Sequence, residues 1–172
     1  MHTLLFLSMR ALHVVLAGAW LGAAMFLALY LVPVVREMGP AGAPVLKALV
    51  RRGVVKYMAS IGGLTVVTGV YLFWRFTGGF DPAISASHAG MAFSVGALTG
   101  LIALILGGSM VGASAKKLVA LDAQAARMPE GAERAALTKT MDGLRARFVT
   151  FGRIVVLLLL ISMVAMALGH YI

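Results

Sequence analysis

Histidine is the residue of this chain best suited to bind a metal or a cofactor, and three of its four histidines stand at the ends of long apolar segments. His13 lies near the start of the first segment, His88 opens the third and His170 closes the fourth. His2 lies further out, where water solvates it. Imidazole nitrogens ligate haem iron and copper. Two histidines at one depth on different helices of a bundle therefore predict a ligand pair.

A haem b held by His13 and His88 is the first chemistry that this spacing predicts. Counting along the apolar segments places both histidines at a similar depth. Arg10 stands one helical turn before His13, and it lies with Arg75 where haem propionates would emerge, as charge-assisted partners. Trp20 follows His13 by two turns and could pack on the ring. The alternative is that these are interfacial histidines and snorkelling arginines that need no ligand.

Copper is the competing chemistry, because each of the three histidines has a methionine on its own helix face. Met9 precedes His13, Met91 follows His88, and Met166 precedes His170. Imidazole together with thioether sulfur suits copper, particularly Cu(I). The predicted copper ligands are then His13, His88, His170, Met9, Met91 and Met166. With 11 methionines in the chain, chance pairing and simple packing are the alternative explanation.

The elements that position these residues are four apolar helices. Apolar residues make up 61% of the 172-residue chain and charged residues only 12%, which excludes an ordinary soluble globule. We expect an all-α, integral membrane four-helix bundle as one domain, 1–172. The expected spans are about 12–35, 57–74, 88–112 and 153–171. Helical spacing continues through about 113–152, which predicts a helical hairpin that extends spans three and four.

The basic residues predict how the bundle is oriented. Thirteen of the 15 lysines and arginines fall in two stretches, 36–56 and 116–153. Because basic residues beside membrane spans stay on the cytoplasmic side, both chain ends and the histidines are expected on the extracytoplasmic side of a bacterial inner membrane. The net charge of +9 favours anionic lipid as partner, and nucleic acid is not expected because no aromatics are interleaved.

Other residue types narrow the function further. No expected span carries an aspartate or glutamate, the chain lacks cysteine, and no hydrolase or ATPase motif is present. Thr65 and Thr68 are expected to bond their own helix backbone. Small residues predict close helix packing. These are Gly18, Gly22, Gly62, Gly63, Gly69, Gly96, Gly100, Gly108 and Gly112.

The first helix also carries a family resemblance. MRALHVVLAGAWLGAAMFLALYLVP resembles the first helix of bacterial membrane proteins related to the copper-resistance D family, through Leu12-His13 and Trp20-Leu21-Gly22. A weaker likeness links it to HemJ-type protoporphyrinogen oxidases, which bind haem b. The resemblance implies that His13 is a ligand and Trp20 its neighbour.

Three functions therefore stay open at the level of the sequence. The first is a haem-binding or electron-transfer subunit, and the second is a copper-handling protein. The third is a cofactor-free accessory subunit of a larger membrane complex, associated with other membrane subunits or with copies of itself.

Overall fold

The computed structural model describes residues 2–172, apart from the side chains of His2 and Pro40, and every regular element in that range is helical. In chain order the elements are α1 (His2–Phe26), η1 (Leu27–Leu31), α2 (Val32–Glu37), η2 (Gly39–Gly42), α3 (Ala43–Arg51), α4 (Val54–Phe76), α5 (Pro82–Ser85), α6 (His88–Leu106), η3 (Gly107–Gly112), α7 (Ala113–Ala125) and α8 (Ala132–Leu168).

Four continuous helices are long and apolar enough to cross a membrane. They are Thr3–Glu37, Val54–Phe76, His88–Ala125 and Ala132–Leu168. This confirms the expectation of an all-helical chain with four apolar helices. The helix that begins at His88 passes through η3 into α7 without a break, and α8 is a single helix of 37 residues.

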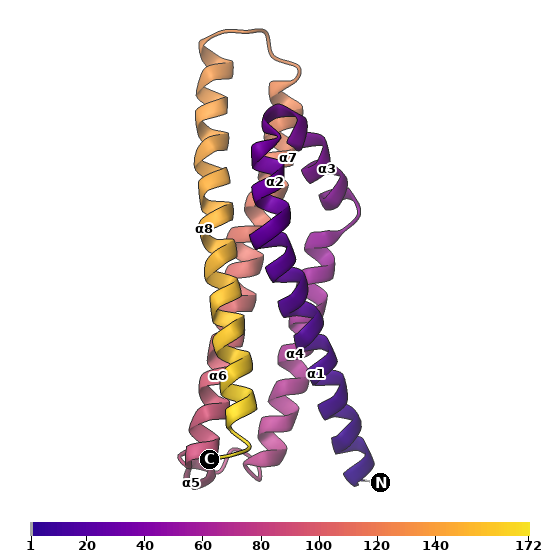
Figure 1. Cartoon of the computed structure of the whole chain (residues 1–172), viewed down its shortest axis with the longest axis vertical. Helices are drawn as coiled ribbons and strands as arrows, with labels where there is room; N and C mark the ends of the chain where they lie inside the picture. Colours follow the sequence, from indigo (N-terminus) through magenta and orange to yellow (C-terminus); the bar gives the residue numbers. More distant parts are fainter. Residues whose placement is uncertain (1) are drawn as a thin grey trace.

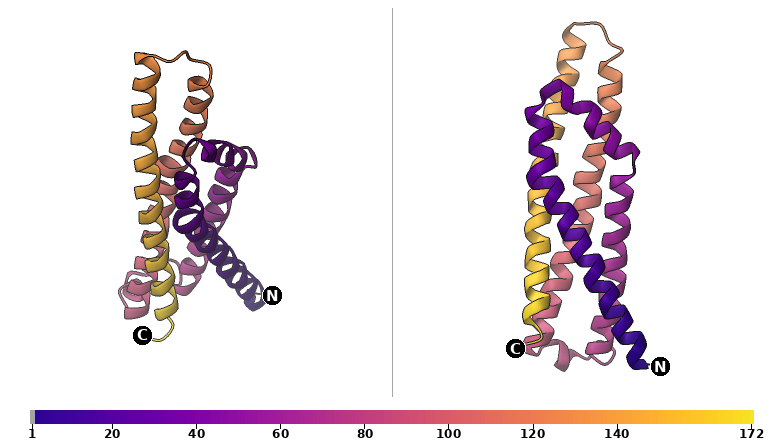
Figure 2. Two further views of the ribbon diagram at one scale, coloured as in Figure 1. Left: turned by 45° about the horizontal axis from the view of Figure 1, so that its top comes forward. Right: turned by 45° about the vertical axis from the view of Figure 1, so that its right-hand side comes forward.

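The helices form an elongated bundle (Figure 1). Both chain ends and α5 lie at one end, here called the terminal end, and the α7–α8 turn lies at the other, here called the basic end. α6 packs along α8, where the Ser162 hydroxyl donates to the Gly96 carbonyl at 2.7 Å. α1 packs on α4 and crosses obliquely, so that η1 reaches α8 (Figure 2).

Glycines permit some of these contacts but not all that the sequence predicts. A Cβ on Gly96 would lie 2.9 Å from Met166 Cε, and one on Gly112 would lie 3.0 Å from Val55 Cγ1. Around Gly18, Gly22, Gly63 and Gly108, no neighbour lies within 4 Å of such a Cβ. The prediction of close packing is wrong at those four positions, because their faces point away from neighbouring helices.

Two of the four helices change to π-helical geometry in mid-course. η1 directly precedes α2, in which Pro33 stands in the first turn. A proline lacks the amide that would bond the preceding turn, and its ring crowds that turn, so the helix must open there. η3 contains Gly107, Gly108 and Gly112, which resist helical distortion weakly. π-helical turns are rare and are found frequently at functional sites.

The apolar core lies at mid-length of the bundle. Its buried members are Trp20, Leu21, Ala24, Ile61, Ala103, Val155, Val156 and Leu159. They come from α1, α4, α6 and α8, so all four long helices meet at this level. The terminal half of the bundle and the half next to the basic end lie on either side of this core.

Candidate functional site

His13 faces α4 rather than an open space. Its Nδ1 lies 2.9 Å from the Thr65 carbonyl oxygen and 3.0 Å from the Thr68 hydroxyl. A carbonyl only accepts, so Nδ1 carries the proton and Nε2 keeps a lone pair. The ring rests on Gly69, where a Cβ would lie 3.0 Å from His13 Cε1. Thr65 and Thr68 also bond their own helix backbone as expected.

His170 joins the two ends of the chain. Its Nε2 lies 3.0 Å from a guanidinium nitrogen of Arg10, which donates, and its ring meets Phe93 edge-on with centroids 5.3 Å apart. Phe93 in turn meets Phe76 at 4.9 Å. This contact ties α1, α6 and α8 together at the terminal end. Arg10 therefore has a protein partner there.

The remaining predicted ligands do not gather at one place. His88 and Met91 are exposed on the first turn of α6, and Arg75 is exposed near the end of α4. Met166 packs on Gly96. Across residues 2–172, no three His, Asp or Glu side chains come close enough to hold a metal ion. The side chain of His2 lies outside what the structure describes.

A large hollow lies on the other side of the core, in the half of the bundle next to the basic end. Its volume is about 840 Å³, within the range of cavities that hold small molecules. All four long helices and α3 contribute to its walls, and both π-helical segments line it. Neither His13 nor His88 lines it. We call it the inner cavity.

Trp20 closes the inner cavity at the level of the core. Its side chain is only 4% exposed, and it packs on Gly62, where a Cβ would lie 2.8 Å from the indole ring. Leu104 completes the closure, with its Cδ1 2.9 Å from the same Cβ position. The indole ring of Trp20 thus forms one end of the inner cavity.

Small residues form the wall of the inner cavity between α4 and η3. Gly112 packs on Val55 and fixes the antiparallel register of these two helices. One turn toward the core, Ala59 and Gly108 both line the inner cavity, and both are exposed. Because both side chains are small, the wall of the inner cavity is thin at this level.

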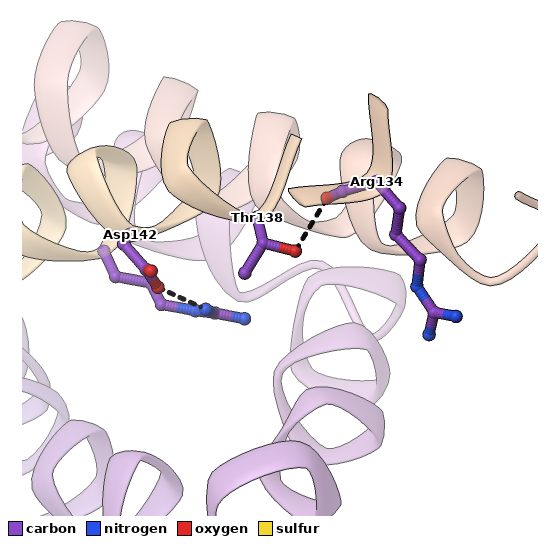
Figure 3. A network of polar contacts seen from close by, with 4 residues as sticks. Arg134, Thr138 and Asp142 are labelled. Carbon is purple, nitrogen blue, oxygen red and sulfur yellow. Dashed lines mark hydrogen bonds and ion pairs between the residues drawn. The ribbon is translucent and has the colours of Figure 1, made fainter. Parts of the chain in front are cut away.

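Charged groups line the inner cavity toward the basic end. They are Arg36, Asp122, Arg134, Asp142 and Arg145. Figure 3 shows Arg134, Thr138 and Asp142 projecting from α8 on the side of the N-terminal half of the chain. Arg145 donates to Asp142 at 2.8 Å, and Arg134 lies 3.7 Å from the highly exposed Glu130. The inner cavity is thus apolar at one end and charged at the other.

The short helix α3 covers one side of the inner cavity. Its apolar residues Leu46, Leu49 and Val50 line the cavity, whereas Lys47 and Arg51 are exposed. Gly53 follows it with φ of +86°, a conformation that a glycine adopts without strain. α3 is therefore an amphipathic helix with its apolar face toward the inner cavity.

The sequence interpretation missed the inner cavity. Its lining is spread over nearly every element, and each residue taken alone has the type expected of a packed apolar helix. The available signals were Pro33 inside an apolar run and the Gly107-Gly108 pair. A proline and two adjacent glycines favour a local opening of the helix.

Comparisons of this chain with protein-family models, with curated proteins and with solved structures found no match.

Proposed function

We propose that this chain is a multi-pass membrane protein that binds a single apolar-tailed amphiphile in the inner cavity. The observation that carries the proposal is the combination of an apolar hollow of about 840 Å³ with small, exposed residues in its wall, Ala59 and Gly108. We infer that a lipid-like molecule enters sideways between these two residues without crossing water. Its polar group then lies toward the charged end.

The proposal includes an orientation. The basic end faces the cytoplasm of a bacterial inner membrane, and both chain ends face outward, because basic residues are retained on the cytoplasmic side. The inner cavity then lies in the cytoplasmic half of the protein. The amphiphile comes from the inner leaflet, and α3 lies along that leaflet with Lys47 and Arg51 toward anionic lipid.

Trp20 gives a direct test, because it closes the cavity and is shielded from surrounding lipid. The chain has two tryptophans, so Trp74→Phe leaves Trp20 as the sole one. Amphiphiles with brominated chains are expected to quench Trp20 fluorescence saturably in this background. Lipids that stay outside the bundle do not reach it.

The matched controls are two identical substitutions at glycines with free space around them. Gly107 lines the inner cavity, so Gly107→Leu is expected to remove the saturable quenching. Gly63 does not line it, so Gly63→Leu is expected to leave quenching unchanged. Equal quenching in both variants, or no quenching in the parent, would sink the proposal.

A second candidate function rests on His13. A ring that donates Nδ1–H to a backbone carbonyl keeps Nε2 free, which is the usual state of a metal-ligating histidine. This favours the haem hypothesis for His13, although no cavity includes it together with His88. The test is an absorption spectrum of purified protein from haem-replete cells, oxidised and then reduced. A Soret band that His13→Ala removes would support it, and a featureless spectrum would reject it.

The copper and accessory-subunit hypotheses stay predictions. Among the described residues, no three His, Asp or Glu side chains lie close enough to hold a metal ion, so copper has no geometric support from those residue types. Metal analysis of the purified protein tests the copper hypothesis. Its oligomeric state and any co-purifying subunits test the accessory-subunit hypothesis.

A further inference from the structure

We infer that the inner cavity selects an amphiphile with a phosphate-bearing head group, bound by Arg36 and Arg145 while its tail extends toward Trp20. This inference rests on the proposed function and adds the chemical class of the ligand. The source is a lipid of the surrounding leaflet. Three observations carry it: the level of the two arginines, their hydrogen-bonding state, and the position of the other charges.

The two arginines stand at the same level on facing walls. Ala28 of η1 meets Gly152 of α8, with 3.8 Å between Ala28 Cβ and a Cβ built on Gly152. The two helices run in opposite directions. Eight residues further toward the basic end, the first helix reaches Arg36 and α8 reaches the residue next to Arg145. At about 1.5 Å per residue, both lie about 12 Å beyond that contact.

Both guanidinium groups have donors to spare. A guanidinium carries five N–H donors, in a planar fork that matches phosphate oxygens. The two ion pairs found within residues 2–172 involve Arg134 and Arg145, and Arg36 takes part in neither. Arg145 uses one nitrogen to bond Asp142 at 2.8 Å, and its side chain is 44% exposed. The charge at this level, counting Arg36, Arg145 and Asp142, is +1.

The other charges lie further from the core. Ser162 of α8 bonds Gly96 of α6, which fixes the antiparallel register of these helices. From that contact, Asp122 is 26 residues along α6–α7 and stands level with position 136 of α8. That is nine residues, or about 13 Å, beyond Arg145. Arg134 lies further still. Among the carboxylates that line the inner cavity, Asp142 is therefore the nearest to a head group at Arg36 and Arg145; Glu37, next to Arg36 in the chain, does not line it.

The apolar part of the inner cavity has the length of a chain. From Trp20 to Arg36 the first helix covers 16 residues, which is about 24 Å. Between them the walls are apolar side chains and glycines, including Phe148 of α8 and Met58 of α4. A single alkyl chain thus fits along the helix axis with a charged group at one end only.

The test compares two probes with the same dibromostearoyl chain, glycerol phosphate against plain glycerol as head group. Both are titrated into the Trp74→Phe protein in neutral detergent, and Trp20 quenching is recorded. The phosphate probe is expected to bind about tenfold more tightly, the effect of one charge-assisted contact. This comparison uses the unsubstituted site and does not depend on the folding of any variant at the arginines.

Three substitutions test whether the charges in the inner cavity cause the preference for the phosphate probe. Arg36→Gln is expected to remove most of the preference for the phosphate probe. Asp142→Asn is expected to increase it, because the nearest negative charge in the inner cavity is lost and Arg145 is released. Arg147 is exposed on α8 and does not line the inner cavity, so Arg147→Gln is the control and is expected to change nothing.

The outcomes separate the two proposals. Equal quenching by both probes in the parent protein overturns the phosphate inference and leaves the proposed function standing. Quenching by neither probe overturns both. A preference for phosphate that Arg36→Gln and Arg147→Gln reduce equally also overturns the inference, because general positive charge would then explain it.

Discussion

At the scale of single residues, neighbouring positions of similar type have different roles. Trp20 is buried against Gly62, whereas the adjacent Gly63 faces open space. His13 of α1 is held by Thr65 and Thr68 of α4, the helix that carries both glycines. The sequence identified His13 and Trp20 as special, but it could not show their partners, because these lie on another helix.

The packing of Trp20 on Gly62 predicts that alanine substitutions at Gly62 and at the adjacent Gly63 have opposite effects on stability. In Gly62→Ala the new methyl group meets the indole ring at 2.8 Å and Leu104 at 2.9 Å, and both are held in the core. Overpacking of this kind costs about 1–3 kcal/mol. Gly63→Ala meets nothing and should stabilise the helix by up to about 1 kcal/mol. Thermal unfolding in detergent measures both, and equal effects would contradict the described packing.

At the scale of elements, apolar periodicity predicted the four helices well. It also predicted the continuation of the third helix, which ends at Ala125 as one piece. The first helix starts at His2, because the apolar residues that precede the expected span 12–35 extend it. The π-helical segments were not predicted from the sequence. Apolar periodicity indicates which face of a helix is apolar, but it does not indicate whether two helices move apart. The inner cavity follows from that separation.

The contact between α6 and α8 predicts that the Ser162 hydroxyl makes a small but measurable contribution to the free energy of unfolding. Ser162 bonds Gly96 across the two helices at 2.7 Å, whereas Ser109 bonds only Ile105 of its own helix at 2.6 Å. Interhelical hydrogen bonds in membrane proteins contribute about 0.6 kcal/mol on average. Ser162→Ala should therefore lower the unfolding free energy by about that amount. Ser109→Ala should leave the unfolding free energy unchanged. A larger loss in Ser109→Ala than in Ser162→Ala would count against the described packing of α6 on α8.

At the scale of the whole molecule, the two ends of the bundle differ in construction. The terminal end is joined by side-chain contacts among α1, α4, α6 and α8, including Arg10 with His170. The half next to the basic end is hollow and is covered by the short helix α3. The proposed exchange of ligand thus belongs to the second half. The first half holds the helices in fixed register.

The proposed orientation can be tested because the chain has no cysteine of its own. Ala86 is exposed beside α5 at the terminal end, and Ala135 is exposed in α8 near the basic end. In intact spheroplasts, a membrane-impermeant maleimide should label Ala86→Cys, and it should label Ala135→Cys only after lysis. The opposite pattern would invert the assigned sides and place the inner cavity in the outer leaflet.

The π-helical segment η1 also lets the first long helix tolerate a change in its length. A π-helical turn contains one residue more than the α-helical turn it replaces. Removing one residue between Leu27 and Leu31 would therefore let the helix continue in ordinary geometry with Arg36 still facing the inner cavity. Removing one residue from an α-helical part of the same helix would instead rotate everything beyond that point by about 100°. η1 is thus a place where this helix can lose a residue while the proposed head-group contact is kept.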